Sequence, residues 1–368
     1  MWMEINWMTS SSNLWLSDKR TGETMKKRNI CHLWLTMLIL AGLLSPASLA
    51  GVEKKAQVGF RFLENPVSAA ALGRGDNGVL GLTGADGVYS NPSAIAWMPG
   101  RADVTLSRTT WIADMGYSSV SAALRGPMNM IFGVDYMSMD YGDFHGTRRA
   151  ENDDGFVETG VFSPSAWVAG LTLSQRVSDR FSYGLRIKYA YQDYGTAQIA
   201  TEGRNLSDTT LVIIDRDYNQ GAPAIDIGTT YGFGFYGIRF GAVIQNFSQE
   251  IQIEREKFPM PFRVSFSADM NLMTLLAPDM VDAHTLRFGV ESLHPRDFKE
   301  RIKFGMEYAL HKSFFVRSGY LINYDERGLT AGIGIRTSLG KTHFVFDYGF
   351  QEFGNFGDVH AFSAGFGF

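Results

Sequence analysis

The sequence predicts an all-β chain: a transmembrane antiparallel β-barrel of about 14 strands with an N-terminal plug segment. Three observations lead to this prediction: a period-two alternation along most of the chain, a composition rich in Gly and aromatic residues, and an aromatic C-terminus. The 368 residues include 40 Gly, 27 Phe and 15 Tyr, while 20% are charged. Many Gly beside many aromatic rings is typical of strands that expose their rings and carry small residues at crowded positions. The 45% hydrophobic content excludes a disordered chain.

The alternation is clearest over residues 181–192, where Phe, Tyr, Leu and Ile occupy every second position. The residues between them are Ser, Gly, Arg, Lys, Ala and Gln. Segments that begin at Phe262, Arg301 and Phe344 repeat the pattern. A period of two over runs of this length predicts β-strands and fits helices poorly.

Runs of this kind occur about 14 times, and an even number suits an outer-membrane barrel. Short turns alternate along the chain with long polar loops, which are expected over 142–163, 195–221 and 248–261. The segment 272–283 breaks this rule, because it is long where a short turn is due. The predicted strands start near Ala102, Tyr117, Met128, Ser165, Arg180, Ala222, Tyr236, Phe262, His284, Glu300, Ser313, Gly328, Lys341 and Val359.

A soluble β-sandwich or propeller would also alternate. The predicted strands, however, approach the roughly ten residues that cross a bilayer at a tilt. The chain also ends on Gly365, Phe366 and Phe368, an ending that resembles the signal that the barrel-assembly machinery reads. We therefore expect that machinery to insert the chain into the outer membrane of a Gram-negative-type bacterium, with outer-membrane lipid around the barrel.

The first fifty residues are expected to lie outside the fold. A basic head, a short apolar run and a small-residue site ending at Ala50 predict a secretory signal peptide over 25–50. The apolar run is too short to span a membrane as a helix. Residues 1–24 are interpreted as an extension from a mis-called start codon. Cleavage after Ala50 removes Cys31, and the mature chain then has no cysteine for disulfides, zinc binding or catalysis.

The polar face of the predicted strands would line the lumen. Its charges are of both signs, which predicts ion pairs across the interior or with a plug; alternatively, each charge is a solvated wall residue. A lumen enclosed by about 14 strands must be filled by water or by the chain's own N-terminus. We assign 51–100 to an N-terminal plug or periplasmic segment and 101–368 to the barrel. The predicted lumen-facing charges are Arg186, Lys188, Arg239, Arg263, Arg287, Glu291, Arg301, Lys303, Glu307, Arg317, Arg336 and Asp347.

The candidate plug contains three short motifs: GFRFL from Gly59, AAALGRGD from Ala69 and GADGVYSNPSAIA from Gly84. Together they resemble the N-terminal block of the PorV/PorQ family, outer-membrane barrels similar to the FadL fatty-acid channel. Arg74 stands where that family often has Met, and Ser93 where it usually has Ala; neither change breaks a turn. The family-motif positions are Phe62, Leu63, Gly73, Gly75, Asp86, Asn91 and Pro92.

The resemblance implies a function in protein export. Proteins of this family bind or escort exported proteins, through the C-terminal domains of the cargo, in type IX secretion, and the charged lumen slightly favours this interpretation. The similarity to FadL implies an alternative, a channel for long-chain fatty acids or other hydrophobic small molecules. A third interpretation is a structural barrel on which a partner docks.

The sequence predicts no enzyme, cofactor or metal site. It contains no G-x-S-x-G elbow and no HExxH motif. His145, His294 and His360 are expected to be surface residues, the acidic loop at 151–154 to be solvated, and the tripeptide 74–76 to form a turn. A net charge of −4 argues against a nucleic-acid partner.

Overall fold

The predicted extension over 1–24 and the predicted signal peptide over 25–50 lie outside the described residues. The described residues belong to one compact unit. The computed structural model describes residues 58–150, 152–200, 213–253 and 256–368.

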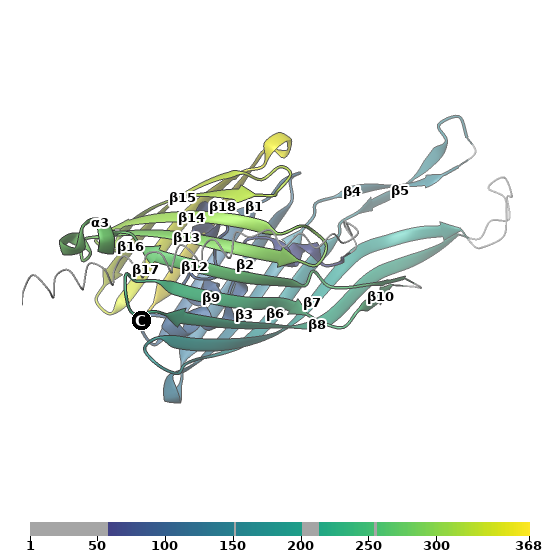
Figure 1. Cartoon of the computed structure of the whole chain (residues 1–368). Helices are drawn as coiled ribbons and strands as arrows, with labels where there is room; N and C mark the ends of the chain where they lie inside the picture. The colour runs from purple at the N-terminus through teal and green to yellow at the C-terminus, as the bar shows by residue number, and fades with distance from the viewer. Residues whose placement is uncertain (1–57, 151, 201–212, 254–255) are drawn as a thin grey trace, which may run out of the picture. The chain divides into compact units, whose positions relative to one another are not determined.

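Fourteen antiparallel strands close into a barrel, as predicted (Figure 1). Thirteen of them begin within about two to three residues of the predicted starts, and β8 begins earlier, at Ile213. The barrel strands are β1 (Ala102–Thr110), β2 (Gly116–Arg125), β3 (Met130–Asp140), β6 (Ser165–Arg176), β7 (Phe181–Ala200), β8 (Ile213–Gly232), β9 (Arg239–Phe247), β12 (Arg263–Asn271), β13 (His284–Pro295), β14 (Arg301–Leu310), β15 (Phe314–Ile322), β16 (Leu329–Leu339), β17 (Thr342–Glu352) and β18 (Asp358–Gly367).

The barrel closes between β1 and β18, the first and last strands. Their register joins Asp103 to Gly367, and the backbone N–H of Phe368 donates to the carbonyl of Ala102 at 3.0 Å. The rings of Phe366 and Phe368 remain exposed on the outside. Closure leaves neither end strand with an unpaired edge, which a spanning sheet requires in lipid.

The outer face of the wall is apolar and the inner face polar. In β7, Leu185 and Ile187 are exposed, whereas Arg186 and Lys188, which alternate with them, are buried. Aromatic rings gather on the outer face near both ends: Trp167 stacks on its neighbours Tyr136 and Tyr191, with ring centres 6.2 and 5.6 Å away, and rings 231, 233 and 235 follow one another at the opposite end. Such belts mark the two membrane–water interfaces.

The long loops contain more strand than predicted. The prediction of a polar loop over 195–221 is wrong in extent, because β7 and β8 continue to pair beyond the end of β6 (Figure 1). This extension is polar on both faces, so it lacks the apolar alternation that reveals a membrane strand. The other two loops contain hairpins: β4 (Phe144–Arg149) with β5 (Phe156–Phe162), and β10 (Ile251–Ile253) with β11 (Glu256–Phe258).

The connection over 272–283 does not alter the strand count. It contains the short helices α3 (Met273–Leu276) and η5 (Pro278–Met280). Two single turns, η4 (Pro127–Asn129) and η6 (Gly354–Phe356), complete the connections. Within the part of the chain that the structure describes, no helix has both the length and the apolar character to cross a membrane.

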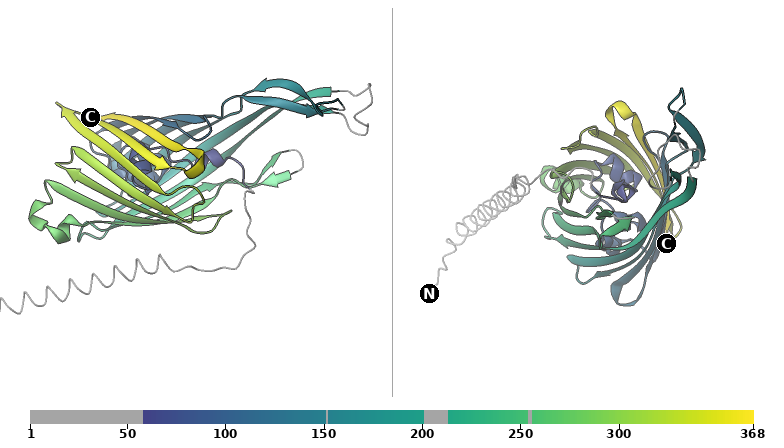
Figure 2. Two further views of the ribbon diagram at one scale, coloured as in Figure 1. Left: turned by 90° about the horizontal axis from the view of Figure 1, so that it is seen from above. Right: turned by 90° about the vertical axis from the view of Figure 1, so that its right-hand side faces the viewer.

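Residues 58–100 lie inside the ring of strands, as the right-hand view of Figure 2 shows; we call this segment the plug. Its core side chains, including Leu72, Val88 and Ile95, pack with Ile131 and Val168 of the wall. The plug contains four short helices: η1 (Arg61–Glu64), α2 (Ala69–Gly73), η2 (Ala85–Tyr89) and η3 (Pro92–Trp97).

Two side chains cap these short plug helices. The Ser68 hydroxyl accepts from the Ala71 N–H at the start of α2. The side-chain oxygen of Asn91 accepts from the Ser93 N–H at the start of η3, while the side-chain amide of Asn91 donates to the backbone carbonyl of Val79 at 2.9 Å. Ser and Asn are favoured N-cap residues because they satisfy N–H groups that a first turn leaves unpaired. The caps therefore let very short helices persist inside the barrel.

The wall carries glycine where the plug backbone touches it. A Cβ on Gly319 would lie 2.2 Å from the backbone nitrogen of Gly75, and one on Gly349 would lie 2.4 Å from the carbonyl oxygen of Ala69. Several of these glycines are directly opposite one another across strands, such as Gly305 with Gly319. The inner wall thus has flat patches onto which the plug backbone packs without side chains between them.

We expect Gly319→Ala to destabilise the barrel by about 1–3 kcal/mol, because the new methyl group overpacks the plug contact. Urea unfolding of the refolded protein in detergent measures this change. Gly232→Ala is the matched control, since the nearest atom to its Cβ would be 3.8 Å away. Equal effects of the two substitutions would show that the plug does not rest on the wall at Gly319.

Candidate functional site

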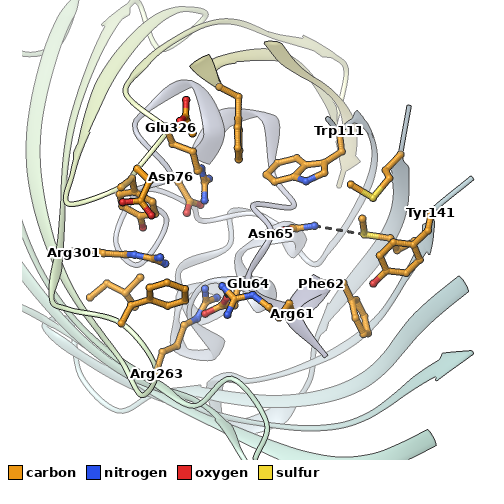
Figure 3. Close-up of a pocket in the computed structure, with 18 residues that line it drawn as sticks. Arg61, Phe62, Glu64, Asn65, Asp76, Trp111, Tyr141, Arg263, Arg301 and Glu326 are labelled. Atoms are coloured by element: carbon orange, nitrogen blue, oxygen red, sulfur yellow. Dashed lines mark hydrogen bonds and ion pairs between the residues drawn. The ribbon is translucent and has the colours of Figure 1, made fainter. Parts of the chain in front are cut away.

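An outer cavity of about 370 Å³ lies above the plug, at the end of the barrel that carries the long hairpins (Figure 3). Its apolar wall includes Trp111, Met139, Tyr141 and Phe353. Trp111 meets Phe353 edge to face, with ring centres 5.5 Å apart. The plug supplies the floor, where the Asn65 amide reaches the Met139 sulfur at 3.5 Å. Large rings held against one another give this side a fixed apolar surface.

The opposite side of the outer cavity is a ladder of alternating guanidinium groups and rings. Arg301 lies between two rings, with its guanidinium carbon 4.3 Å from the ring centre of Phe298 and 4.4 Å from that of Tyr324. The guanidinium carbon of Arg61 lies 4.9 Å from the ring centre of Phe298, and that of Arg327 lies 5.1 Å from the ring centre of Tyr324. Such cation–π contacts orient the arginines. Arg61 is also ion-paired, with Glu64 at 2.9 Å and with Asp297 at 2.6 Å.

Three arginines of this cavity have no carboxylate partner among the described residues. Arg263 donates from Nε to the Gln245 amide oxygen at 2.8 Å, and Arg327 donates from Nε to Gln351 at 3.0 Å. Arg301 has a buried Nε without a hydrogen-bond partner. The outer cavity is therefore amphipathic, with rings on one side and a charged side on which these arginines stand beside the carboxylates of Glu64, Asp76 and Glu326.

Below the outer cavity, ion pairs tie neighbouring wall strands together. Arg186 bonds to Asp135 and to Asp226, the latter at 3.0 Å. Lys188 bonds to the same Asp226 at 2.7 Å and to the Asn246 amide oxygen at 2.5 Å. This group joins β3, β7, β8 and β9, and all of its charges are buried.

A second ion-paired group ties the plug to the wall. Lys303 lies 2.9 Å from a carboxylate oxygen of Asp76 in the plug and 3.2 Å from Glu291 in β13. Its ammonium also donates to the Asp76 carbonyl at 3.0 Å. A buried ammonium with three acceptors is fully satisfied, so Lys303 fixes the turn at 74–76 to β14.

A lower cavity of about 250 Å³ lies under the plug, at the end of the barrel with the short turns. Arg317 pairs there with Glu307 at 2.7 Å and with Asp347 at 2.6 Å. Its other cationic wall residues are Arg239, Arg287 and Arg336.

The predicted site residues thus separate into groups. The twelve predicted lumen charges are divided among the outer cavity (Arg263, Arg301), the two ion-paired groups (Arg186, Lys188, Glu291, Lys303) and the lower cavity (Arg239, Arg287, Glu307, Arg317, Arg336, Asp347).

The family-motif positions lie along the plug. Phe62 lines the outer cavity, and Leu63 packs against the adjoining core. Asp86 lines the lower cavity. The remaining motif residues contact wall glycines: Gly73 meets Gly332, Gly75 meets Gly319, Asn91 meets Gly228 and Pro92 meets Gly184. Gly365, from the predicted insertion signal, lines the lower cavity.

The sequence prediction missed several residues of these sites. Asp135 and Asp226 stand at inward positions of their strands, so the alternation itself was the signal that could have found them. Trp111 and Tyr324 lie in turns between strands, where no periodicity indicates which way a side chain points.

One cluster has the residue types of a hydrolase but not its geometry. Ser292 donates to Glu300 at 2.6 Å and lies 3.4 Å from Nδ1 of His294. Ser292 is 2% exposed, so its hydroxyl is not an accessible nucleophile. His145 and His294 are exposed as expected, while His360 is partly covered and contacts the Tyr348 hydroxyl at 2.9 Å.

The remaining minor predictions concern loops and metals. Residues 74–76 form the predicted turn. In the acidic loop, Asp153 and Asp154 are exposed, and Glu151 lies outside the described residues. Among the described residues, no three His, Cys, Asp or Glu side chains gather closely enough to hold a metal ion.

We expect Asp226→Ala to lower the free energy of unfolding by about 3–5 kcal/mol, because it leaves Arg186 and Lys188 buried with one fewer carboxylate. Urea titration of the refolded barrel measures this loss. Asp179→Ala is the control: Asp179 is exposed in a short turn, and its removal should change stability by less than about 0.5 kcal/mol. A small effect of Asp226→Ala would contradict a structural function for the pair.

Asp86 gives a pH-dependent prediction. Its carboxyl has a pKa raised to about 6, mainly by burial; the hydrogen bond with Ser68 and the charge of Arg317 lower the pKa, while the nearby Asp347 and Asp103 raise it. The folded protein therefore favours the protonated acid, and the free energy of unfolding should fall as the pH rises from about 4 through about 6. Asp86→Asn, which mimics the neutral acid, should remove that fall. Thermal unfolding of the wild-type protein and of Asp86→Asn between these pH values measures the fall in stability. Parallel curves of melting temperature against pH for the two proteins would contradict the prediction.

Comparison with known proteins identifies the fold. No protein-family model matches the sequence, and no curated protein matches it either. The toluene transporter TbuX of Ralstonia pickettii superposes with a TM-score of 0.53 at 12% identity, over 81% of this chain and 96% of that one. The toluene transporter TodX of Pseudomonas putida superposes with a TM-score of 0.53 at 9% identity, over 86% of this chain and 98% of that one. A FadL homologue of Pseudomonas aeruginosa superposes with a TM-score of 0.51 at 11% identity, over 82% of this chain and 97% of that one.

At these identities the likeness is one of fold. It extends over nearly the full length of each of the three solved chains, including the closed barrel and the segment that precedes it. The chain thus has the fold of these solved structures, a closed antiparallel barrel of 14 strands preceded by an N-terminal segment.

Proposed function

We propose that this barrel is an outer-membrane channel for hydrophobic small molecules, and that the outer cavity is the first site at which they bind. The observation that carries the proposal is the aromatic wall of that cavity, directly above the plug. The fold supports it, since two of the structurally similar proteins are described as toluene transporters. This function is the alternative interpretation of the sequence, a channel for long-chain fatty acids or other hydrophobic small molecules.

The dimensions and chemistry of the outer cavity suit such a ligand. Its volume of about 370 Å³ falls within the usual range of small-molecule sites. Trp111, Phe353 and Phe62 present rings that an apolar chain or an aromatic ring can contact. Glu64, Asp76 and Glu326 also line the charged side, but Arg263 and Arg301 form no ion pair among the described residues, so these two arginines are available to an anionic head. A fatty acid has this combination of properties.

Binding of oleate and of toluene to the purified barrel, measured by calorimetry in detergent, tests the proposal. We expect Trp111→Ala to weaken both ligands about tenfold, because it removes a ring from the apolar wall. Arg301→Gln should weaken oleate alone, since toluene carries no charge. Leu339→Ala is the control, because Leu339 is exposed at the other end of the barrel. No saturable binding of either ligand, or no effect of Trp111→Ala, would contradict the proposal.

A second candidate function is the escort of exported proteins, as the resemblance to the PorV/PorQ family implies. The observation that favours it is the pair of projecting hairpins, β4–β5 and the extension of β7–β8 (Figure 1). A groove of about 580 Å³ between them is lined by Phe162, Tyr194 and Tyr218, among others. A polypeptide could lie along this groove outside the barrel.

Affinity capture from gently solubilised outer membranes, followed by mass spectrometry, separates the candidates. Cargo escort predicts secreted proteins that share a C-terminal domain, and their loss when residues 144–162 are replaced by a short turn. A barrel that serves only as a docking platform predicts one stoichiometric partner instead. Capture of lipid or fatty acid alone would contradict the second candidate and leave the channel.

A further inference from the structure

A groove of about 500 Å³ lies on the outer face of the wall, beside the seam where β1 pairs with β18; we call it the seam groove. Ala364 lies between Leu106 and Phe346 in the strand register, so one small side chain separates two large exposed ones. The other exposed apolar residues of the seam groove are Ile333, Ile335 and Phe362. The seam groove therefore belongs to the face that meets lipid, on the other side of the wall from the lumen.

Arg108 lines the seam groove at the end nearer the long hairpins. It stands two residues before the end of β1, and the connection that follows supplies Trp111 to the outer cavity. In the strand register Arg108 lies opposite Phe362, which in turn lies opposite Tyr348. This row therefore carries a guanidinium and a phenol, whereas the row of Ala364, two residues nearer the middle of the wall, is apolar.

The Arg108 side chain is exposed and has no carboxylate partner among the described residues. Its Nη1 donates to the Ser118 hydroxyl at 2.8 Å, which leaves other N–H donors of the guanidinium for a ligand. Asp347 also borders the seam groove, but its carboxylate pairs with Arg317 of the interior at 2.6 Å. An arginine on the lipid-facing side of a barrel is tolerated best near the membrane surface, where it reaches the lipid headgroups.

We infer that the seam groove binds a phosphate-bearing acyl lipid of the outer leaflet, with its phosphate on Arg108 and one acyl chain over Ala364. Guanidinium groups bind phosphate oxygens through paired N–H···O bonds. The order of the two rows matches a lipid of that leaflet, whose head lies toward the long hairpins and whose chains run toward the middle of the bilayer. The inference goes beyond the proposed channel and does not depend on it, because the seam groove is on the opposite face of the wall.

Native mass spectrometry of the purified barrel, released from neutral detergent micelles, tests this site. The two probes are phosphatidic acid and phosphatidylcholine with the same acyl chains. We expect one phosphatidic acid molecule per barrel, retained about tenfold more tightly than phosphatidylcholine, because the choline cation opposes Arg108. Equal retention of the two lipids would show ordinary lipid contact and overturn the inference. Pairs of barrels that retain no lipid would assign the seam groove to a second copy of the chain and overturn it as well.

Two pairs of variants locate the lipid. Arg108→Gln should weaken retention of phosphatidic acid about tenfold, whereas Arg149→Gln, which removes an exposed arginine from the projecting hairpin, should not (Figure 1). Ala364→Phe fills the seam groove and should also weaken retention. Its control is Ala242→Phe, at an outward position of β9 on a distant part of the wall. No effect of Arg108→Gln or of Ala364→Phe, or equal effects of either control, would overturn the assignment.

Discussion

The close packing of the plug backbone on a glycine-lined wall is the constraint on which the rest of the structure depends. Gly75 of the plug lies against Gly319, and Gly73 lies against Gly332, with no room for a Cβ between the backbones. Because the plug lies this close to the wall, it separates the outer cavity from the lower cavity. The short capped helices of the plug are held by this contact and by Lys303, which bonds to the turn at Asp76.

The charges of the interior follow from the same arrangement. Where the wall faces the plug directly, cations and carboxylates are paired, as in the group around Asp226. Along the two cavities the pairing is less complete: Arg301 and Arg327 of the outer cavity and Arg336 of the lower cavity each have a buried nitrogen without a hydrogen-bond partner.

Much of the fold could be predicted from the residues, because strand periodicity is a local property. The alternation predicts the barrel strands and their inner face. The structure differs from this prediction where alternation is absent, as in the polar extension of β7 and β8. The cavities could not be predicted in the same way. They depend on which inward residues meet across the lumen, such as Gly75 with Gly319, and on side chains from turns, such as Trp111.

The central claim is that hydrophobic molecules enter the barrel through the outer cavity. Uptake of radiolabelled oleate by cells that lack the barrel, and by cells complemented with wild-type or Trp111→Ala protein at equal surface levels, tests it most directly. The account predicts that wild-type protein restores uptake and that Trp111→Ala restores much less. Uptake that is the same with and without the barrel would contradict it.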